Sequence, residues 1–440
     1  MKSRRNEVII CFLIGICFLW TGSGYLTWMY RLLDFYPSAT VDVLTEVAGY
    51  LFQVVGLLLF SVFSKRKGEA IQRKWAFVFV MMADLCLIVL SEFAWNHVTS
   101  LIFGYSMNLL HGVVAGFYLT KLVTHVSQQH RGRVFGLGYG IGSIGSWIIS
   151  LVGNGNFLHS PYVLISYALF AGISVALVIK IDEEDDFEIG HMEAGEAKLS
   201  KKLILLTMIT LILLSTVKSV GFYFPTADLS SGNIRLEFTR MFYALGLVTA
   251  GFIADRNRKY GAVCCIAALV FPFALLVLQA DVGSSIFLWI TGYIFFGFFV
   301  VYRVIVFADF AGKGGSCLYL AGGGLLFGRL GDVIGTTIGI CLTNRLSLLV
   351  ILAAILFVVT ILLFFMFYQK MYFPILSEEK NAELLLEDFS QKYGLSPREK
   401  EVFSLIKEGR SNSEIAGDLY ISENTVKFHM KNILRKPPKI

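Results

Sequence analysis

Residues 411–433 read Ser411-Asn-Ser-Glu-Ile-Ala-Gly-Asp-Leu-Tyr-Ile-Ser-Glu-Asn-Thr-Val-Lys-Phe-His-Met-Lys-Asn-Ile433. Ser411 and Glu414 have the spacing of a capping box, in which each side chain satisfies a backbone N–H group at the start of a helix. Ser422 can cap a second helix after the turn at Tyr420. This stretch therefore predicts a short helix that ends near residue 419 and a longer helix that ends near residue 436.

A further helix precedes these two. Ser396 and Glu399 form another capping box, Pro397 occupies the first helical position, and Gly409 ends the helix. Apolar residues at helical spacing can form one small core. They are Val402, Leu405, Ile406, Ile415, Leu419, Ile421, Val426 and Ile433. The last two helices and their tight turn predict a helix-turn-helix, whose final helix enters the major groove of DNA.

From Asn424 onward the final helix carries basic residues and no acidic ones. From Asn424 to the end of the chain these are Lys427, Lys431, Arg435, Lys436 and Lys439. A one-sided basic helix is the electrostatic footprint of phosphate binding. Double-stranded DNA, as a promoter or operator, is therefore the expected partner.

Three segments resemble the LuxR-type (GerE) helix-turn-helix family. They are Ser396-Pro-Arg-Glu399 with Glu401 and Val402, Gly409-Arg-Ser-Asn412 with Glu414, Ile415 and Ala416, and Ile421-Ser422 with Asn424-Thr-Val-Lys427, His429, Asn432 and Ile433. The resemblance implies that the third helix reads DNA. The positions that contact DNA in this family can be carried over to the third helix of this chain, and Arg435 is added as the basic residue that ends the helix. The expected DNA-binding residues are Asn424, Thr425, Val426, Lys427, His429, Lys431 and Arg435.

The chain departs from this family after the third helix. The family continues with a fourth helix that supports dimerisation, whereas here Pro437-Pro-Lys-Ile440 follows. Two prolines do not continue a helix. The sequence therefore predicts that the fourth helix is absent, which leaves open whether two copies of the chain pair as a homodimer.

The rest of the chain has the composition of a membrane protein. Its 440 residues are 56% hydrophobic and 16% charged, whereas soluble domains average about 45–50% apolar and about 25% charged residues. About twelve apolar runs are long enough to cross a bilayer as helices. They lie near residues 8–30, 43–63, 75–93, 99–121, 134–153, 162–181, 203–224, 237–254, 261–280, 285–309, 316–342 and 346–368.

Basic residues alternate between the loops. The amino terminus (Lys2, Arg4, Arg5) and the even-numbered loops are basic, while the odd-numbered loops have few charges. The positive-inside rule then predicts a multi-pass protein of the cell's inner (plasma) membrane with both termini in the cytoplasm. The expected domains are a first six-helix half (1–181), an acidic cytoplasmic loop (182–202), a second six-helix half (203–370), a linker (371–391) and the helix-turn-helix domain (392–440).

The segment Gly251-Phe-Ile-Ala-Asp-Arg-Asn-Arg-Lys259 follows the eighth run. Asp255 can hold the basic residues of this loop against neighbouring helix ends. The segment resembles the loop that follows spans two and eight in the major facilitator superfamily. The copy after span two, residues 61–68, lacks the aspartate. The resemblance of residues 251–259, the six plus six spans and the long central loop together imply an all-α, major-facilitator-like bundle. The glycine run 136–145 favours close packing of its helices.

Polar and ionisable residues inside membrane spans are candidates for a functional site. In the resembled fold, spans one, four, seven and ten line a central cavity, and this implies a ligand site. Its expected residues are Trp20, Tyr25, Tyr105, Asn108, His111, Lys218, Tyr302 and Arg303. Cations and aromatic rings together favour an anionic or aromatic small molecule. Arg329 and Asp332 are spaced to neutralise each other on one helix.

The sequence shows no nucleophile–base constellation and no Cys-x-x-Cys pair among its seven cysteines. We therefore expect neither enzyme activity, nor a metal site, nor a cofactor. The two resemblances imply a membrane-bound LuxR-type transcriptional regulator that senses a small molecule through its membrane region. Two alternatives stay open: a facilitator-type transporter with an accessory regulatory tail, and a product whose shortened tail no longer regulates.

Overall fold

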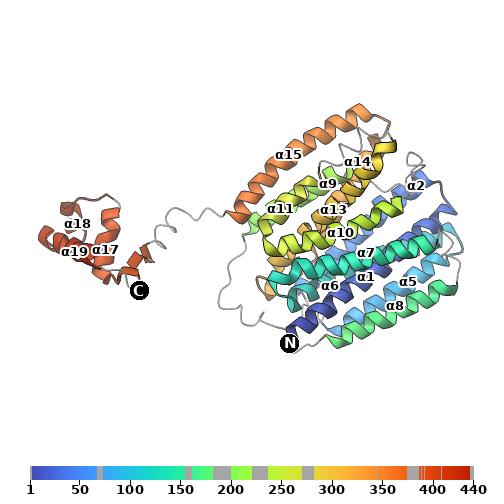
Figure 1. The fold of residues 1–440 in the computed structure, drawn as a ribbon, viewed down its shortest axis with the longest axis horizontal. Helices are drawn as coiled ribbons and strands as arrows, with labels where there is room; N and C mark the ends of the chain where they lie inside the picture. Colours follow the sequence, from blue (N-terminus) through green and yellow to red (C-terminus); the bar gives the residue numbers. More distant parts are fainter. Residues whose placement is uncertain are drawn as a thin grey trace. The chain divides into compact units, whose positions relative to one another are not determined.

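The computed structural model describes residues 2–66, 73–153, 161–181, 200–220, 236–269, 282–342, 344–373, 386–387, 389–390, 392–407 and 409–436. The chain divides into two compact units, Met1–Tyr368 and Gln369–Ile440. Within the described ranges both units are built from helices and contain no strand (Figure 1). Most of the predicted acidic loop, much of the predicted span 261–280 and residues 437–440 lie outside these ranges.

The first unit contains a helix at each of the predicted spans. Its first half comprises α1 (Lys2–Leu33), α2 (Ser38–Asp42), the π-helical turn η1 (Val43–Gly49), α3 (Tyr50–Arg66), α5 (Lys74–Glu92), α6 (His97–His125), η2 (Gln128–His130), α7 (Arg131–Gly153) and α8 (Pro161–Lys180). Its second half comprises α9 (Lys201–Val220), α10 (Leu236–Arg256), α11 (Arg258–Ala267), α13 (Val282–Ala311), η7 (Gly315–Leu320), α14 (Gly323–Leu342) and α15 (Leu346–Tyr372).

Length and composition qualify most of these helices as membrane spans. Among the described residues, 8 helical segments are long and apolar enough to cross a bilayer. Three of the remaining predicted spans coincide with α7, α8 and α10, and α11 covers the start of the fourth, residues 261–267. We call Met1–Tyr368 the membrane unit.

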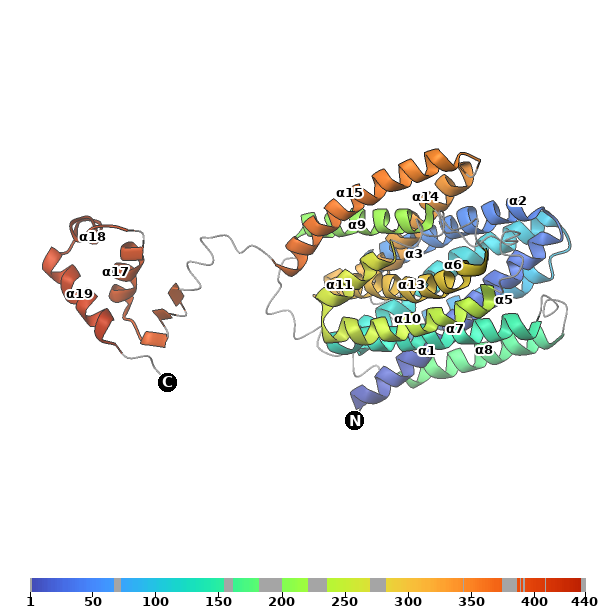
Figure 2. The ribbon, with the colours of Figure 1, turned by 45° about the horizontal axis from the view of Figure 1, so that its top comes forward.

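The helices of the membrane unit run alongside one another in both views (Figures 1 and 2). In the first half α1 packs against α6 and α7, and in the second half α14 packs against α9. The halves meet where α7 packs against α10 and where α3 packs against α14. Glycines permit this approach: a Cβ atom on Gly136 would lie 2.4 Å from the carbonyl oxygen of Leu247, and one on Gly138 would lie 2.5 Å from that of Cys11. The glycine run therefore packs helices together, as the sequence predicted.

The carboxyl-terminal unit, Gln369–Ile440, contains α17 (Pro397–Lys407), α18 (Asn412–Asp418) and α19 (Glu423–Arg435). Its core is formed by Val402, Ile415, Ala416 and Val426, with the other predicted apolar residues packed around them. Gly409 has φ +80°, a conformation that suits glycine, and it follows the end of α17 as predicted. Burial of one apolar stripe from each helix makes this unit a small three-helix domain.

Candidate functional sites

The membrane unit contains a partly open cavity of about 250 Å³ between its two halves. Helices α1, η1, α3, α6 and α7 of the first half and α10, α13 and α14 of the second half line it. Its wall is rich in phenol rings, which belong to Tyr25, Tyr50, Tyr118, Tyr139, Tyr243 and Tyr293. Such a wall suits a small ligand with an aromatic or apolar body and a few polar groups.

Two charged residues of opposite sign also reach the cavity. Glu46 comes from η1 in the first half, and its Oε1 accepts a hydrogen bond of 2.8 Å from the Tyr25 hydroxyl. Arg329 comes from α14 in the second half, and its guanidinium lies 4.1 Å from the centre of the Tyr50 ring. Neither residue was among the ligand residues expected from the sequence. Arg329 was noticed only as a partner of Asp332, whereas Glu46 could have been noticed as an ionisable residue within an apolar run.

A buried carboxylate next to the cavity gathers several cations. Asp332 on α14 lies 2.8 Å from Lys218 Nζ on α9, 3.4 Å from Arg303 Nη1 on α13 and 3.9 Å from Arg329 Nη1. The Ser219 hydroxyl donates a further hydrogen bond of 3.1 Å to it. One negative charge thus faces three positive ones. The sequence paired Asp332 with Arg329 alone, but the shorter contacts come from other helices.

The expected ligand residues do not all lie on one wall. Tyr25 and His111 line the cavity, whereas Lys218 and Arg303 are held by Asp332. Trp20 is fully buried with its ring at an edge-on angle to His111.

Three further expected residues are engaged with neighbouring helices. Tyr105 stacks on Phe52 with ring centroids 4.7 Å apart. Asn108 accepts a hydrogen bond of 2.7 Å from Gln53. Tyr302 is buried and lies near Gly261 of α11. The structure therefore does not place these three on the cavity wall.

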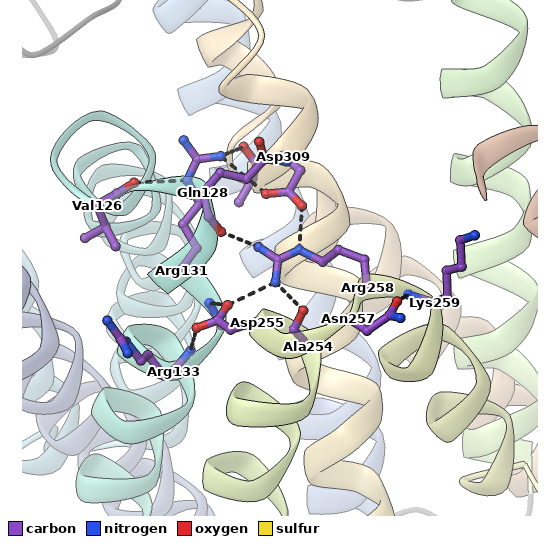
Figure 3. A network of polar contacts seen from close by, with 12 residues as sticks. Val126, Gln128, Arg131, Arg133, Ala254, Asp255, Asn257, Arg258, Lys259 and Asp309 are labelled. Atoms are coloured by element: carbon purple, nitrogen blue, oxygen red, sulfur yellow. Dashed lines mark hydrogen bonds and ion pairs between the residues drawn. The ribbon is translucent and has the colours of Figure 1, made fainter. Parts of the chain in front are cut away.

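A polar network joins the two halves at one end of the unit (Figure 3). Asp255 on α10 accepts hydrogen bonds from the backbone N–H groups of Gly132 and Arg133, at 2.7 and 2.8 Å, and so caps the start of α7. Arg258 donates to Asp255 at 2.9 Å and to Asp309 of α13 at 2.8 Å. Asp255 therefore holds a neighbouring helix end, as the sequence predicted.

Arg131 completes this network from the start of α7. It donates to Asp309 at 3.3 Å and to the carbonyl oxygen of Val126 (Figure 3). It also donates to the carbonyl oxygens of Val123 and Ala308. Because its side chain is buried, these acceptors replace the water that a guanidinium requires. The network fixes the first half against the second at this end.

No group of His, Cys, Asp and Glu side chains within the described ranges could hold a metal ion.

In the carboxyl-terminal unit, α19 has one core face and one solvent face. Asn424, Lys427, Lys431 and Arg435 are exposed, and their spacing places them along one side of the helix. Thr425 and His429 are half-buried at the border of this side. We call these six residues the basic face of α19.

Val426 lies on the opposite side of α19. Its side chain is 0% exposed and belongs to the core with Val402 and Ile415. A side chain without solvent access cannot contact a base. The expectation that Val426 faces DNA is therefore wrong, and its role is in packing.

The helix starts are fixed by the capping residues that the sequence predicted. Ser411 Oγ accepts from the Glu414 backbone N–H at 3.3 Å, and the Glu414 carboxylate accepts from the Ser411 N–H at 2.8 Å. Ser422 Oγ accepts from the Thr425 N–H at 3.1 Å. These bonds satisfy N–H groups that have no partner within a helix.

Glu399 links the first helix of this unit to the last. Its carboxylate is buried, accepts a hydrogen bond of 2.7 Å from the Ser396 N–H, and pairs with the Lys436 ammonium after α19. Burial raises the pKa of Glu399, but Lys436 and Ser396 lower it by more, so that this pKa lies below its usual value of 4.5. The folded unit therefore favours the ionised carboxylate.

Glu399→Gln is expected to lower the free energy of unfolding of this unit by about 1–3 kcal/mol at neutral pH, since it removes a charge-assisted hydrogen bond. Because the folded-state pKa is the lower one, the stabilisation by Glu399 is present above pH 4.5 and is lost as the pH falls through the folded-state pKa. The variant should therefore lose less stability on acidification than the parent. Urea unfolding of residues 369–440, followed by circular dichroism at several pH values, measures this.

Glu401→Gln is the matched control, because Glu401 pairs with Arg398 on the exposed side of α17. Exposed pairs contribute about 0–1 kcal/mol. Equal acid sensitivity in Glu399→Gln and the parent would contradict the role given to Glu399.

The two units define the class of protein: a multi-pass membrane protein that carries a helix-turn-helix domain. Residues 394–436 match the family described as "Bacterial regulatory proteins, luxR family". The spore germination protein GerE of Bacillus subtilis is 42% identical over 50 residues, which are 11% of this chain and 68% of that protein. The chain belongs to the LuxR family of bacterial regulatory proteins.

Two further relatives match over stretches of similar length. The uncharacterized transcriptional regulatory protein YhcZ of Bacillus subtilis is 54% identical over 44 residues, 10% of this chain and 21% of that protein. The CsgBAC operon transcriptional regulatory protein of Escherichia coli is 52% identical over 42 residues, 10% of this chain and 19% of that protein. The chain thus covers about a fifth of the length of each of these two relatives.

The membrane unit has the fold of major facilitator transporters, as its sequence predicted. The human organic anion transporter MFSD10 (TETRAN) superimposes with a TM-score of 0.59 at 11% identity, over 83% of this chain and 100% of that one. The fucose:proton symporter FucP of E. coli superimposes with a TM-score of 0.56 at 13% identity, over 84% and 99%. At these identities the likeness concerns the fold.

Proposed function

We propose that this chain is a transcriptional regulator of the inner membrane, with both termini in the cytoplasm. Its membrane unit binds a small molecule and its carboxyl-terminal unit binds double-stranded DNA. The proposed division of the chain is the one expected from its sequence: two six-helix halves, the loop 182–202, the linker 371–391 and the domain 392–440.

The observation that carries this proposal is the basic face of α19, in a chain that also holds membrane-spanning helices. Lys427, Lys431 and Arg435 are exposed along one side of the helix that a helix-turn-helix inserts into the major groove. Asn424 stands at the amino end of the same side, where base edges are contacted. We also propose that two copies of the chain bind one operator, since helix-turn-helix proteins commonly bind paired half-sites.

The ligand is proposed to be a small anionic or aromatic molecule. The excess of cations around Asp332 and the phenol rings of the cavity support this choice. A ligand changes the output only if it binds two conformations of the membrane unit with different affinity. Because the linker 371–391 is the only covalent connection to the DNA-binding domain, the signal is proposed to pass through it.

Lys427→Ala and Lys431→Ala are each expected to weaken DNA binding by about tenfold, since each removes a charged contact to phosphate. Each should also reduce the slope of log affinity against log salt by about 1. Cross-linking and immunoprecipitation of the full chain in cells identifies the bound promoters. Gel-shift titration of residues 369–440 on those promoters, over a range of salt, measures the affinity.

Lys400→Ala is the control, because Lys400 lies on α17 and pairs with Glu387. It should leave the affinity and the salt slope unchanged. Equal loss in all three variants would indicate general charge attraction and count against α19 as the reading helix. Absence of any promoter enrichment by the full chain would reject the regulator itself.

The facilitator fold also favours a second candidate, a transporter with an accessory regulatory tail. Reconstituted proteoliposomes separate the two. Net flux of a small aromatic carboxylate would favour transport, whereas a ligand-dependent reporter response without flux favours the regulator.

A further inference from the structure

We propose that the ligand of the membrane unit is amphoteric: a small aromatic molecule whose anionic group binds Arg329 and whose cationic group binds Glu46. This inference rests on the proposed function, which requires only some small anionic or aromatic ligand. It names the chemical class of that ligand and the way in which it joins the two halves.

The first argument is the placement of the two charges. Glu46 belongs to η1 of the first half, Arg329 belongs to α14 of the second half, and η1 and α14 are packed against each other. Both side chains reach the same cavity. Across the described residues Arg329 forms its ion pair with Asp332, at 3.9 Å, and none with Glu46. The cavity therefore presents an acid on one wall and a base on the other.

The second argument is the cost of burying these groups. Glu46 is only 4% exposed, and its Oε1 accepts a hydrogen bond from a neutral phenol, the hydroxyl of Tyr25. A buried charge without a direct ion pair is costly, and a ligand that supplies a charged group in contact with it relieves that cost. A plain anion would satisfy Arg329, but it would place a second negative charge near Glu46. A ligand with both charges avoids this repulsion.

The third argument is the shape and chemistry of the wall. Tyr25 and Tyr50 stack with ring centroids 5.6 Å apart, and Phe18 and Tyr139 stack at 3.7 Å. Aromatic rings on several sides favour an aromatic ligand body. A volume of about 250 Å³ lies below the roughly 300–1,000 Å³ typical of pockets for drug-sized molecules. One ring with two small charged groups therefore suits this space.

The consequence is a link between the halves. A ligand that binds Glu46 and Arg329 at the same time stabilises the conformation in which η1 and α14 are close. It therefore binds that arrangement more tightly than one in which the halves separate, which is the difference in affinity that a signal requires.

The test compares amphoteric probes with their one-charge counterparts on the purified full chain in detergent, by isothermal titration calorimetry. L-phenylalanine is compared with phenylpropanoate and phenylethylamine. The para isomer of aminomethylbenzoate, whose charges lie at opposite ends of the ring, is compared with para-methylbenzoate and para-methylbenzylamine. At least one amphoteric probe is expected to bind on the order of tenfold more tightly than both of its counterparts.

Variants assign this preference to the two residues. Glu46→Gln should remove the preference of the amphoteric probe over the carboxylate, and Arg329→Gln should remove its preference over the amine. Glu92→Gln is the matched control, since Glu92 is a buried acid of α5 outside the cavity lining, and it should keep both preferences.

The probe comparison on the parent chain decides the matter even if a variant fails to fold. If in both series the carboxylate binds as tightly as its amphoteric counterpart, the inference is overturned, but an anionic ligand, and hence the proposed function, is left intact. Failure of all the probes to bind also overturns it. The promoter experiment above uses no ligand, so its failure would reject the proposed function separately.

Discussion

Val426→Asp is expected to unfold the carboxyl-terminal unit and to abolish its DNA binding. Val426 is 0% exposed in a core that contains only three other fully packed residues, Val402, Ile415 and Ala416. An unpaired carboxylate at this position would cost about 3–5 kcal/mol. A small domain has roughly 5 kcal/mol or less to lose, because its single core is limited. The variant should therefore be largely unfolded at room temperature.

Circular dichroism of residues 369–440 measures the loss of helix, and gel shift measures the loss of DNA binding. Lys427→Asp, at the adjacent exposed position of α19, is the control. It should retain its helix content and yet lose DNA affinity, because it reverses a charge on the basic face. A Val426→Asp variant that keeps its fold but changes operator preference would instead show that position 426 reads bases.

Local rules were sufficient to predict the carboxyl-terminal unit. The Ser411–Glu414 box, the Ser422 cap and the glycine at 409 act over three or four residues, and the structure shows each one as predicted. The error at Val426 came from carrying family positions over as a block. Helical periodicity already placed Val426 in phase with Ile433, one heptad away on the core side. Where the two arguments differed, the periodicity was right.

The membrane unit was predictable in outline but not in its contacts. Apolar runs of sufficient length indicate where helices lie, because a bilayer requires about 20 apolar residues for each span. They do not indicate which helix faces which. Asp332 is bound by Lys218, on a helix more than a hundred residues earlier in the chain, rather than by Arg329 alone. Glu46 lies in a π-helical turn ahead of α3, and no local pattern directs it toward Arg329.

Asp332→Asn is expected to destabilise the membrane unit more than other single replacements of a carboxylate there. Asp332 is 3% exposed and is the carboxylate bound by Lys218, Arg303 and Arg329. The substitution keeps the size of the side chain and removes its charge. Three cations would then remain with no counter-ion among these contacts, and breaking such a buried pair costs about 3–5 kcal/mol.

The expected result is a lower melting temperature of the purified full chain in detergent, together with reduced yield in membranes. Asp34→Asn is the control, because Asp34 pairs with Arg31 at 2.8 Å but is half exposed. Exposed pairs contribute about 0–1 kcal/mol, so its melting temperature should stay close to that of the parent.

A second substitution shows whether the loss comes from charge. Lys218→Met replaces the nearest cation by an apolar side chain of similar length, and the double variant Asp332→Asn, Lys218→Met should recover part of the lost stability. Recovery is expected because replacing both members of a buried ion pair by apolar residues of similar volume costs little stability. Removing only one member leaves an unpaired buried charge, which is strongly destabilising. If the double variant melts as low as Asp332→Asn alone, then Asp332 stabilises the unit through packing or through its hydrogen bond to Ser219. In that case its carboxylate does not stabilise the unit by neutralising the positive charges beside the cavity.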